Sequence, residues 1–345
     1  MLDVLKGLGK GPKNLITDVE GLTVGNAQDM GALTGVTVVL ADPPATAAVH
    51  IAGGAPGTRE TDALAPESLV EAADAIVLSG GSVYGLDAAS GVTAWLGARG
   101  RGFEIAGVAT AAPIVPAAIL FDLGNGGDKG WGETPPYSDL GKQAAAAASG
   151  DFCLGNAGAG LGATAGALKG GLGSASIATA SGLTVGALVA ANPVGSVVIP
   201  GTARLWAAPY EIDDEFGGHG WPEMPFPSVA ADPFEGSKLG AMSAGANTTI
   251  AVIATNAKLT RTELRRVAIM AHDGLARAIR PVHTPFDGDT IFTLATGRRD
   301  LHGDRPVLVA ALGALAADTL ARAVARAVHE ATSIGPHKAL RDRHT

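Results

Sequence analysis

Glycine content is the feature of this sequence that most limits the folds open to it. The chain has 49 glycines in 345 residues, while Phe, Trp and Tyr together make up only 4%. Hydrophobic residues account for 47% and charged residues for 17%, so a sizeable core is expected and disorder is not. Few aromatic side chains are available to fill that core. We therefore expect tightly packed layers of alanine, glycine and valine rather than aromatic-rich clusters.

Charge and cysteine content argue against several classes of protein. The formal net charge is −8, and no basic cluster is longer than Arg265-Arg266 or Arg298-Arg299. Nucleic-acid binding needs clustered lysine and arginine to neutralise phosphates, so no nucleic-acid partner is expected. The single cysteine, Cys153, excludes an internal disulfide framework and a multi-cysteine metal site, and it fits a reducing compartment.

Hydropathy along the chain predicts a soluble cytoplasmic protein. The N-terminus, MLDVLKGLGKGPKNLITDVEG, lacks the apolar core and the small-residue cleavage site of a signal peptide. No uncharged apolar stretch reaches about 18 residues, the length that suggests a membrane span. The alanine-rich C-terminal segment is interrupted by Asp318, Arg322 and Arg326. We therefore expect no membrane partner.

Strand and helix patterns interleave without a regular βαβ repeat. Apolar and β-branched runs predict short strands at residues 16–25, 35–40, 47–52, 73–78, 182–192, 195–199, 247–256 and 290–296. Helical patterns predict four helices. The first ends near residue 96, the second covers 139–148, and the fourth covers about 306–330. The third begins at the capping box Thr260-Arg261-Thr262-Glu263 and runs to about 279. Many strands are apolar on both faces, which predicts a layered α/β sandwich with two buried sheets and helices outside.

Three segments carry no clear secondary-structure pattern. Residues 1–15 are expected to be a flexible lead-in, and residues 155–176 form a glycine-rich tract. Residues 201–240 are rich in proline, acids and large aromatics. Such a long irregular stretch indicates a functional loop, a lid or a linker.

Common signatures of metal and nucleotide chemistry are missing. His272 and Asp273 lie within one predicted helix, and the later histidines, His283 included, lack the spacing of metal ligands. There is no G-x-S-x-G motif, and no phosphate-binding GK[ST] motif because Lys169 is followed by Gly170. The glycine loops offer anion binding as a hypothesis, but close packing is the simpler explanation.

The junction Asn247-Thr248-Thr249 is more informative. A loop of small residues, 243–246, runs directly into an apolar strand that begins with two hydroxyl residues. If the bond before Thr248 breaks, the freed α-amine lies within reach of the threonine hydroxyl and, unprotonated near neutral pH, serves as its base. The same hydroxyl can make the break by attacking the Asn247 carbonyl. On spacing alone, an ordinary edge strand is the more common explanation.

A second cluster is Asp287-Gly288-Asp289. Two carboxylates that flank a glycine can lie on one side of a tight turn, where each perturbs the titration of the other. They could hold a terminal ammonium group and orient the nucleophile. A solvated turn leading into the next strand is, again, more common by itself.

Taken together, these residues resemble the family of self-processing peptidases typified by L-aminopeptidase/D-amidase-esterase. That family also holds β-peptidyl aminopeptidases and nylon-oligomer (6-aminohexanoate oligomer) hydrolases. The resemblance extends over residues 16–330, and it is carried by GGAPGTRETD, LSGGSVYGLDAASGV, PIVPAAILFDL, GALKGGLGSAS, ANPVG, GANTTIAVIATN and HTPFDGDTIF. Each motif alone is weakly specific, but their shared order reverses the preference for an ordinary strand at Thr248.

The resemblance implies a four-layer αββα sandwich of the self-processing aminopeptidase and ornithine acetyltransferase type. It implies one hydrolase domain, residues 1–345, cleaved into an α chain (1–247) and a β chain (248–345). It also implies that no metal or organic cofactor is required, and that α/β pairs assemble into a homotetramer.

Roles for five residues follow from the same resemblance. The nucleophile falls on Thr248, and the paired acidic residues about forty positions downstream fall on Asp287 and Asp289. An asparagine of the oxyanion pocket falls on Asn192, and a lysine near the nucleophile falls on Lys169. The Asn-Thr junction and the Asp-Gly-Asp pair look more like the nylon-oligomer hydrolase branch than like aminopeptidases with serine at this position. A turn residue and a surface lysine are the simpler explanations for Asn192 and Lys169.

The pocket departs from the family pattern at one position. Some members place a tyrosine where this chain has Phe121, so its hydroxyl cannot contribute here, and Tyr84 is the phenol that remains to line the pocket. We expect an amide hydrolase that acts on short peptides or small linear amides. Two alternatives stay open from the sequence: an acyltransferase of the ornithine acetyltransferase type, and a non-catalytic protein that binds a small anion.

Overall fold

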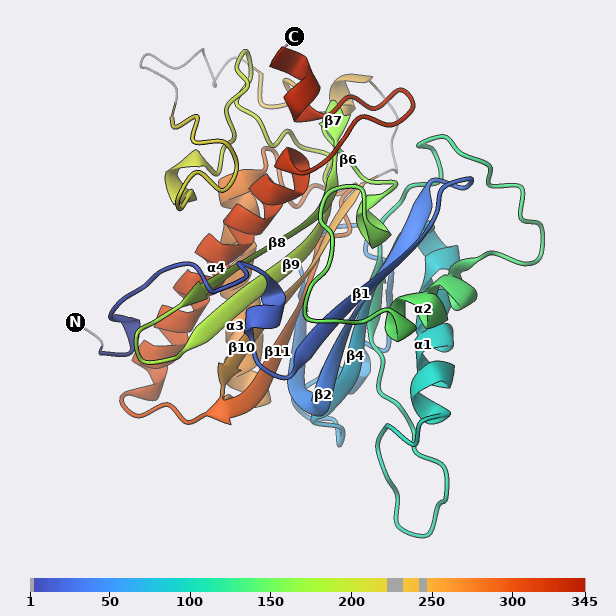
Figure 1. Cartoon of the computed structure of the whole chain (residues 1–345), viewed down its shortest axis with the longest axis vertical. Coiled ribbons are helices and arrows are strands. Elements are labelled where there is room, and N and C mark those ends of the chain that lie inside the picture. The colour runs from blue at the N-terminus through green and yellow to red at the C-terminus, as the bar shows by residue number, and fades with distance from the viewer. Residues whose placement is uncertain (1–2, 222–231, 242–246, 345) are drawn as a thin grey trace.

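The computed structural model describes residues 3–221, 232–241 and 247–344, and among these residues nine strands form one mixed sheet (Figure 1). The strands are β1 (Leu22–Asp29), β2 (Thr34–Ile51), β3 (Thr58–Arg59), β4 (Ala72–Ser79), β5 (Ala117–Ile119), β8 (Gly171–Ala178), β9 (Thr184–Asn192), β10 (Thr248–Ala257) and β11 (Thr290–Arg299). Their order is β3-β5-β4-β2-β11-β10-β9-β8, and β1 pairs with β2. A separate hairpin joins β6 (Thr164–Ala165) to β7 (Leu168–Lys169).

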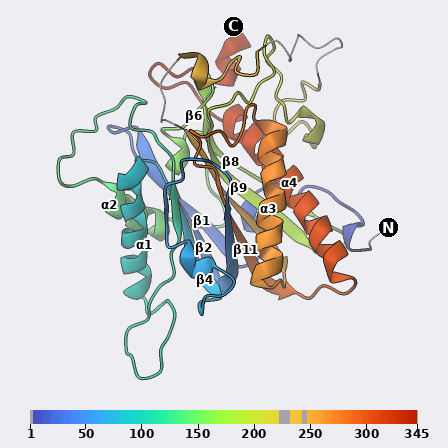
Figure 2. The same cartoon turned by 180° about the vertical axis from the view of Figure 1, so that it is seen from behind.

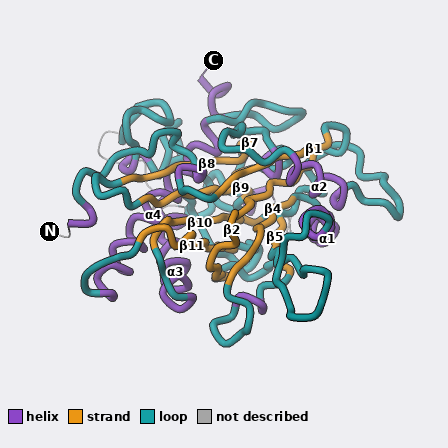
Figure 3. Tube along the Cα trace, turned by 60° about the horizontal axis from the view of Figure 1, so that its bottom comes forward, coloured by secondary structure: helices purple, strands orange, loops and turns teal. Residues whose placement is uncertain are grey.

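Three buried clusters show that this sheet folds over to form the middle layers of an αββα sandwich. The outer helices are α1 (Ala88–Gly97), α2 (Tyr137–Ala146), α3 (Arg261–Ala278) and α4 (Arg305–His329). One cluster lies under α3 and α4, one between the two halves of the sheet, and one under α1 and α2. Figures 1 and 2 show the two helix pairs on opposite faces, and Figure 3 shows the strands between them. The predicted four-layer architecture is confirmed.

The long strand β2 joins the two sheet layers. Its first half pairs with β1 and β4, and its second half pairs with β11. The register with β4 shifts between Leu40 and Ala45, where residues 42–44 are exposed. The two strands predicted at 35–40 and 47–52 are therefore halves of one strand, because a bulge bends the chain there without ending the strand.

Layers approach closely where glycine faces a neighbouring backbone. A Cβ at Gly274 of α3 would lie 2.2 Å from the carbonyl oxygen of Ala317 on α4. A Cβ at Gly173 of β8 would lie 2.0 Å from the carbonyl oxygen of Ala323, so any larger residue would push α4 away. Helix α4 is long and apolar enough to cross a membrane, but 72% of that apolar window is buried inside the protein, as expected for a core helix.

Three sequence-based predictions of strands are wrong. The strand predicted at 16–25 is β1, which begins only at Leu22, and residues 16–18 form a short 3-10 helix. The glycine-rich tract 155–176 contains the start of β8, which the sequence conceals because glycine, serine and alanine give no alternation of apolar and polar residues. Residues 195–199 do not form a strand. Ser196 and Val198 make only isolated bridges, to Arg280 and Leu205.

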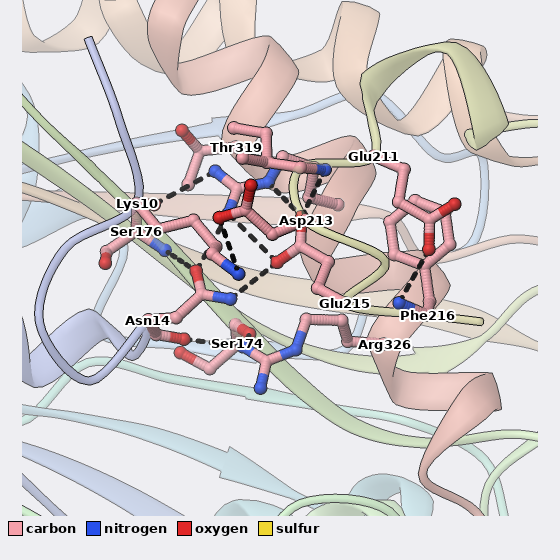
Figure 4. A network of polar contacts seen from close by, with 12 residues as sticks. Lys10, Asn14, Ser174, Ser176, Glu211, Asp213, Glu215, Phe216, Thr319 and Arg326 are labelled. Carbon is pink, nitrogen blue, oxygen red and sulfur yellow. Dashed lines mark hydrogen bonds and ion pairs between the residues drawn. The ribbon is translucent and has the colours of Figure 1, made fainter. Parts of the chain in front are cut away.

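A polar network that includes Asn14, Glu215 and Arg326 holds the end of the predicted lead-in against α4 (Figure 4). The Arg322 guanidinium contacts both carboxylate oxygens of Glu215, at 2.5 and 2.9 Å, and it donates to Asn14 Oδ1 at 2.8 Å. Arg326 donates to the carbonyl oxygen of Asn14. Burial opposes ionisation of Glu215, but the hydrogen bonds and charge of Arg322 outweigh it and hold the pKa of the carboxyl group below its usual value. The expectation of a flexible lead-in is therefore wrong for its last residues.

Candidate active site

Strand register brings the predicted site residues together at the start of β10. Strand β10 is antiparallel to β9, and Thr248 lies directly opposite Asn192, the last residue of β9. On its other side β10 is parallel to β11, and Ile250 pairs with Thr290. The turn that carries Asp287 and Asp289 therefore ends beside the first residues of β10.

The hydroxyl of Thr248 lies against the peptide bond that precedes it. Thr248 is only 2% exposed, and its Oγ1 donates a hydrogen bond to the carbonyl oxygen of Asn247. A Cβ at Gly288 would lie 2.7 Å from this Oγ1 and 2.6 Å from the carbonyl oxygen of Ala55. Glycine at 288 therefore leaves the space that the hydroxyl occupies.

Asp289 holds the main chain beside Thr248. Its Oδ1 accepts the N–H of Thr249 at 2.8 Å. Its Oδ2 accepts Nδ1–H of His283 at 2.7 Å and the N–H of His283 at 3.2 Å. Both carboxylate oxygens are thus occupied, and the side chain is buried. Asp289 links the start of β10 to the loop before β11.

Asp287 lies in a different polar environment. Its Oδ1 accepts the N–H of Val194 at 3.0 Å, and its Oδ2 accepts the N–H and the hydroxyl of Thr284 at 3.0 and 2.6 Å. Burial, and next the charge of Asp289, raise the pKa of the Asp287 carboxyl group. The negative charge of Asp289 therefore opposes the ionisation of Asp287, as a like charge in a buried site does.

Asn192 connects Thr248 to three other segments. Its Oδ1 accepts the N–H of Thr164 at 2.9 Å and Nζ of Lys238 at 3.1 Å, and its Nδ2 donates to the carbonyl oxygen of Phe121 at 3.1 Å. Phe121 therefore reaches the site through its main chain. The simpler explanation of Asn192 as a turn residue does not describe this buried, fully oriented carboxamide.

Lys169 lies one step further from Thr248. Its ammonium group is fully buried and donates to the carbonyl oxygens of Gly160, Ala163 and Gly170 at 2.8, 2.9 and 2.9 Å. Burial lowers the pKa of Lys169 to about 7. It is therefore not a surface lysine, and it braces the β6–β7 hairpin, in which Thr164 pairs with Lys169.

Two residues at the site were not predicted. Lys238 lies in the irregular segment 201–240, where no pattern marks it. His283 lacks the spacing of a metal ligand, and the sequence marks it by its position four residues before Asp287. Tyr84 is 47% exposed and packs edge-on against Trp131, so its place in a substrate pocket stays a prediction.

Binding of a metal ion would require a group of suitable side chains in the described part of the site. Among the residues that the structure describes, no three His, Cys, Asp or Glu side chains are placed to share an ion. The polar groups around Thr248 instead supply hydrogen-bond donors, two carboxylates and two lysines. This composition suits proton transfer and stabilisation of an oxyanion.

The fold is that of the N-terminal-nucleophile hydrolases. The solved L-aminopeptidase D-Ala-esterase/amidase from Ochrobactrum anthropi, described as a variant of that fold, superimposes with a TM-score of 0.69 at 22% identity. The match covers 96% of this chain and 90% of the other. A β-aminopeptidase from a Burkholderia species gives a TM-score of 0.68 at 24% identity, over 97% and 92% of the two chains.

Sequence comparison narrows the class to one family. Residues 14–340 match peptidase family S58, and the chain belongs to that family. An uncharacterised aminopeptidase of Mycobacterium tuberculosis is 46% identical, over 95% of this chain and 97% of its own. The 6-aminohexanoate-oligomer endohydrolase of a Kocuria species is 30% identical, over 94% and 89%. The predicted resemblance is confirmed, and the chain is a hydrolase of peptide or amide bonds.

Proposed function

We propose that this peptidase cuts its own chain between Asn247 and Thr248. Thr248, now an N-terminal residue, then hydrolyses the amide bonds of short peptides or small linear amides. The observation that carries the proposal is the buried hydroxyl of Thr248 in contact with the carbonyl group of Asn247, directly opposite Asn192. The α chain would then be 1–247 and the β chain 248–345.

Cleavage rearranges the peptide bond between Asn247 and Thr248 and consumes one water. Oγ1 of Thr248 bonds to the carbonyl carbon of Asn247, the C–N bond breaks, and the nitrogen takes up a proton. Water then adds to the resulting ester, which releases a carboxylic acid on Asn247 and restores the hydroxyl of Thr248. The new α-amine remains beside the hydroxyl, because Asp289 holds the N–H of Thr249.

Turnover repeats the same chemistry on a substrate. The free α-amine accepts the proton of Oγ1 as the oxygen attacks the substrate carbonyl, and it returns that proton to the leaving amine. Asp287 and Asp289 supply negative charge that favours the ammonium form and orients the amine. Asn192 forms part of the pocket that stabilises the oxyanion. Lys169 acts indirectly, because it stabilises the β6–β7 hairpin that bonds to Asn192 through Thr164.

The names of the relatives support the proposed substrate class. Relatives carry the names aminopeptidase and 6-aminohexanoate-oligomer endohydrolase, so both short peptides and linear ω-amino amides are proposed substrates. A panel of amino-acid nitroanilides and 6-aminohexanoate oligomers separates the two. If the enzyme hydrolyses neither the nitroanilides nor the oligomers, both proposed substrate classes are wrong.

Removing the hydroxyl tests the mechanism directly. Thr248→Ala should be purified as one chain near the full 34.2 kDa, without hydrolytic activity. Thr248→Ser, which keeps a hydroxyl at the same place, should still be cleaved and active. If Thr248→Ala still splits at the same bond, the proposed mechanism is wrong.

A further inference from the structure

Before cleavage Thr248 has no free α-amine, because its nitrogen is still part of the peptide bond to Asn247. Its hydroxyl therefore needs a different proton acceptor for the first cut than for later turnover. This requirement follows from the proposed self-cleavage. The groups that surround Thr248 in the intact chain are therefore the ones to examine for this role.

Lys238 is held against the residue opposite Thr248. Its Nζ donates to Oδ1 of Asn192 at 3.1 Å and to the carbonyl oxygen of Asn192 at 3.3 Å. Its main-chain N–H donates to the carbonyl oxygen of Val194 at 2.9 Å, and the N–H of Val194 donates to Asp287 at 3.0 Å. Lys238 is thus fixed at both ends, by its main chain and by its amine, within the cluster that contains the nucleophile.

Lys169 is less suited to the role. All three hydrogen bonds of Lys169 go to carbonyl oxygens of the glycine-rich segment, at Gly160, Ala163 and Gly170. Losing a proton would cost it one of these bonds, and none of them leads to Thr248 or Asn192. Its described contacts make it a brace for the hairpin.

The charges that face Lys238 come from two segments. Asp287 and, behind it, Asp289 approach from the loop before β11, with His283 bound to Asp289. Lys169 approaches from β7. Burial lowers the pKa of Lys238 to about 7, Asp287 opposes that change and Lys169 adds to it. A large fraction of the amine is therefore neutral near neutral pH, when an exposed lysine is almost wholly charged.

We propose that Lys238 is the proton acceptor for the hydroxyl of Thr248 in self-cleavage. The neutral amine takes the proton of Oγ1 as the oxygen bonds to the carbonyl carbon of Asn247. The C–N bond breaks, and the nitrogen of Thr248 receives that proton back from the Lys238 ammonium group. Water then hydrolyses the ester, and the new α-amine of Thr248 replaces Lys238 as the base in turnover.

The test measures the rate of self-cleavage in newly synthesised protein. Full-length protein is pulse-labelled by cell-free translation, diluted into buffers from about pH 5 to about pH 9, and sampled for conversion of the intact chain into fragments 1–247 and 248–345. The wild-type rate should rise about tenfold per pH unit at low pH and level off above the pKa of Lys238, about 7. A profile with no inflection near neutral pH would overturn the proposal.

Two variants separate proton transfer from charge and packing. Lys238→Met removes the amine, and Lys238→Arg keeps the charge but stays protonated across this range. Both should slow cleavage by about a hundredfold or more and lose the inflection. Lys258→Met, which replaces an exposed lysine, should match the wild type. Circular dichroism reports whether each variant has folded. If a variant has not folded, the pH profile of the wild-type cleavage rate alone tests the proposal.

The outcomes distinguish this proposal from self-cleavage itself. If the wild type is never cut at residue 247, self-cleavage fails first. If the wild type is cut and either variant is cut at the wild-type rate, Lys238 is not the acceptor and self-cleavage stands. A slowed Lys238→Arg that keeps the wild-type pH inflection would also overturn the proposal, because a purely structural role leaves the titrating group in place.

Discussion

At the scale of single residues, the site is built from shared hydrogen bonds. Asp289 divides its two oxygens between the N–H of Thr249 and the ring of His283. The His283 imidazole therefore holds the Asp289 carboxylate in place, and this carboxylate in turn holds the start of β10, which carries Thr248. This makes His283 a positioning residue, one that acts on the reaction through Asp289.

Replacing His283 should weaken catalysis without weakening substrate binding. A hydrogen bond to a charged group contributes about 1.5–3 kcal/mol, so His283→Ala should lower kcat of cleaved enzyme by about ten- to a hundredfold with KM little changed. His302→Ala, at an exposed position, is the matched control. Steady-state hydrolysis of an amino-acid nitroanilide measures both constants. A change confined to KM would contradict the positioning role.

Sequence alone could identify part of this site. Thr248, Asp287, Asp289 and Asn192 lie in recognisable motifs, and the structure brings them together around the start of β10. Lys238 could not be found in this way. Its contact with Asn192 joins residues 46 positions apart in the chain, and no local pattern encodes such a contact.

At the scale of secondary-structure elements, the sequence predicted correctly those helices and strands that have a strong local pattern of residues. Strand β10 and helix α3 follow a long β-branched run and a capping box, in which Thr260 and Glu263 bond as expected. Strand β8 was missed because its small residues are defined by their packing against α4, which is tertiary information. The bend in β2 falls at Asp42-Pro43-Pro44, where the prolines have no N–H to donate to the sheet.

The contact between α3 and β2 makes stability depend on pH. His272 of α3 is 6% exposed and faces the rings of His50 and His283, at 5.0 and 4.8 Å between centroids. Burial, and next the charge of His283, lower the pKa of His272 from 6.5 to about 4. The unfolded chain therefore binds a proton at a pH where the folded chain does not. Stability should fall as pH decreases from about 6.5 through about 4.

His272→Gln removes this titration. Between about pH 7 and about pH 5 the wild type should lose about 2 kcal/mol more of its free energy of unfolding than the variant. Urea unfolding at the two pH values measures the difference. An equal loss in the two proteins would show that His272 is not responsible.

At the scale of the whole molecule, the cut would leave two interlocked pieces. Helix α4 belongs to the piece that begins at Thr248, while Asn14 and Glu215 belong to the other. The side chains of Arg322 and Glu215 are 1% and 3% exposed, so their ion pair lies inside this contact. Strand β10 also pairs with β9 of the other piece along its length.

The two pieces should therefore remain together after cleavage. They are expected to elute as one species in size-exclusion chromatography and to separate only in denaturant. Arg322→Met leaves Glu215 buried without its partner, which should cost about 3–5 kcal/mol of stability. Urea unfolding of cleaved protein gives that value. Free fragments in native buffer from the wild type would contradict the interlocked arrangement.

Intact-mass analysis of the purified protein, with N-terminal sequencing, tests the central claim most directly. We predict two polypeptides from the wild type, the smaller of which begins Thr-Thr-Ile-Ala. Active enzyme that consists only of an unbroken chain of 34.2 kDa would contradict the account.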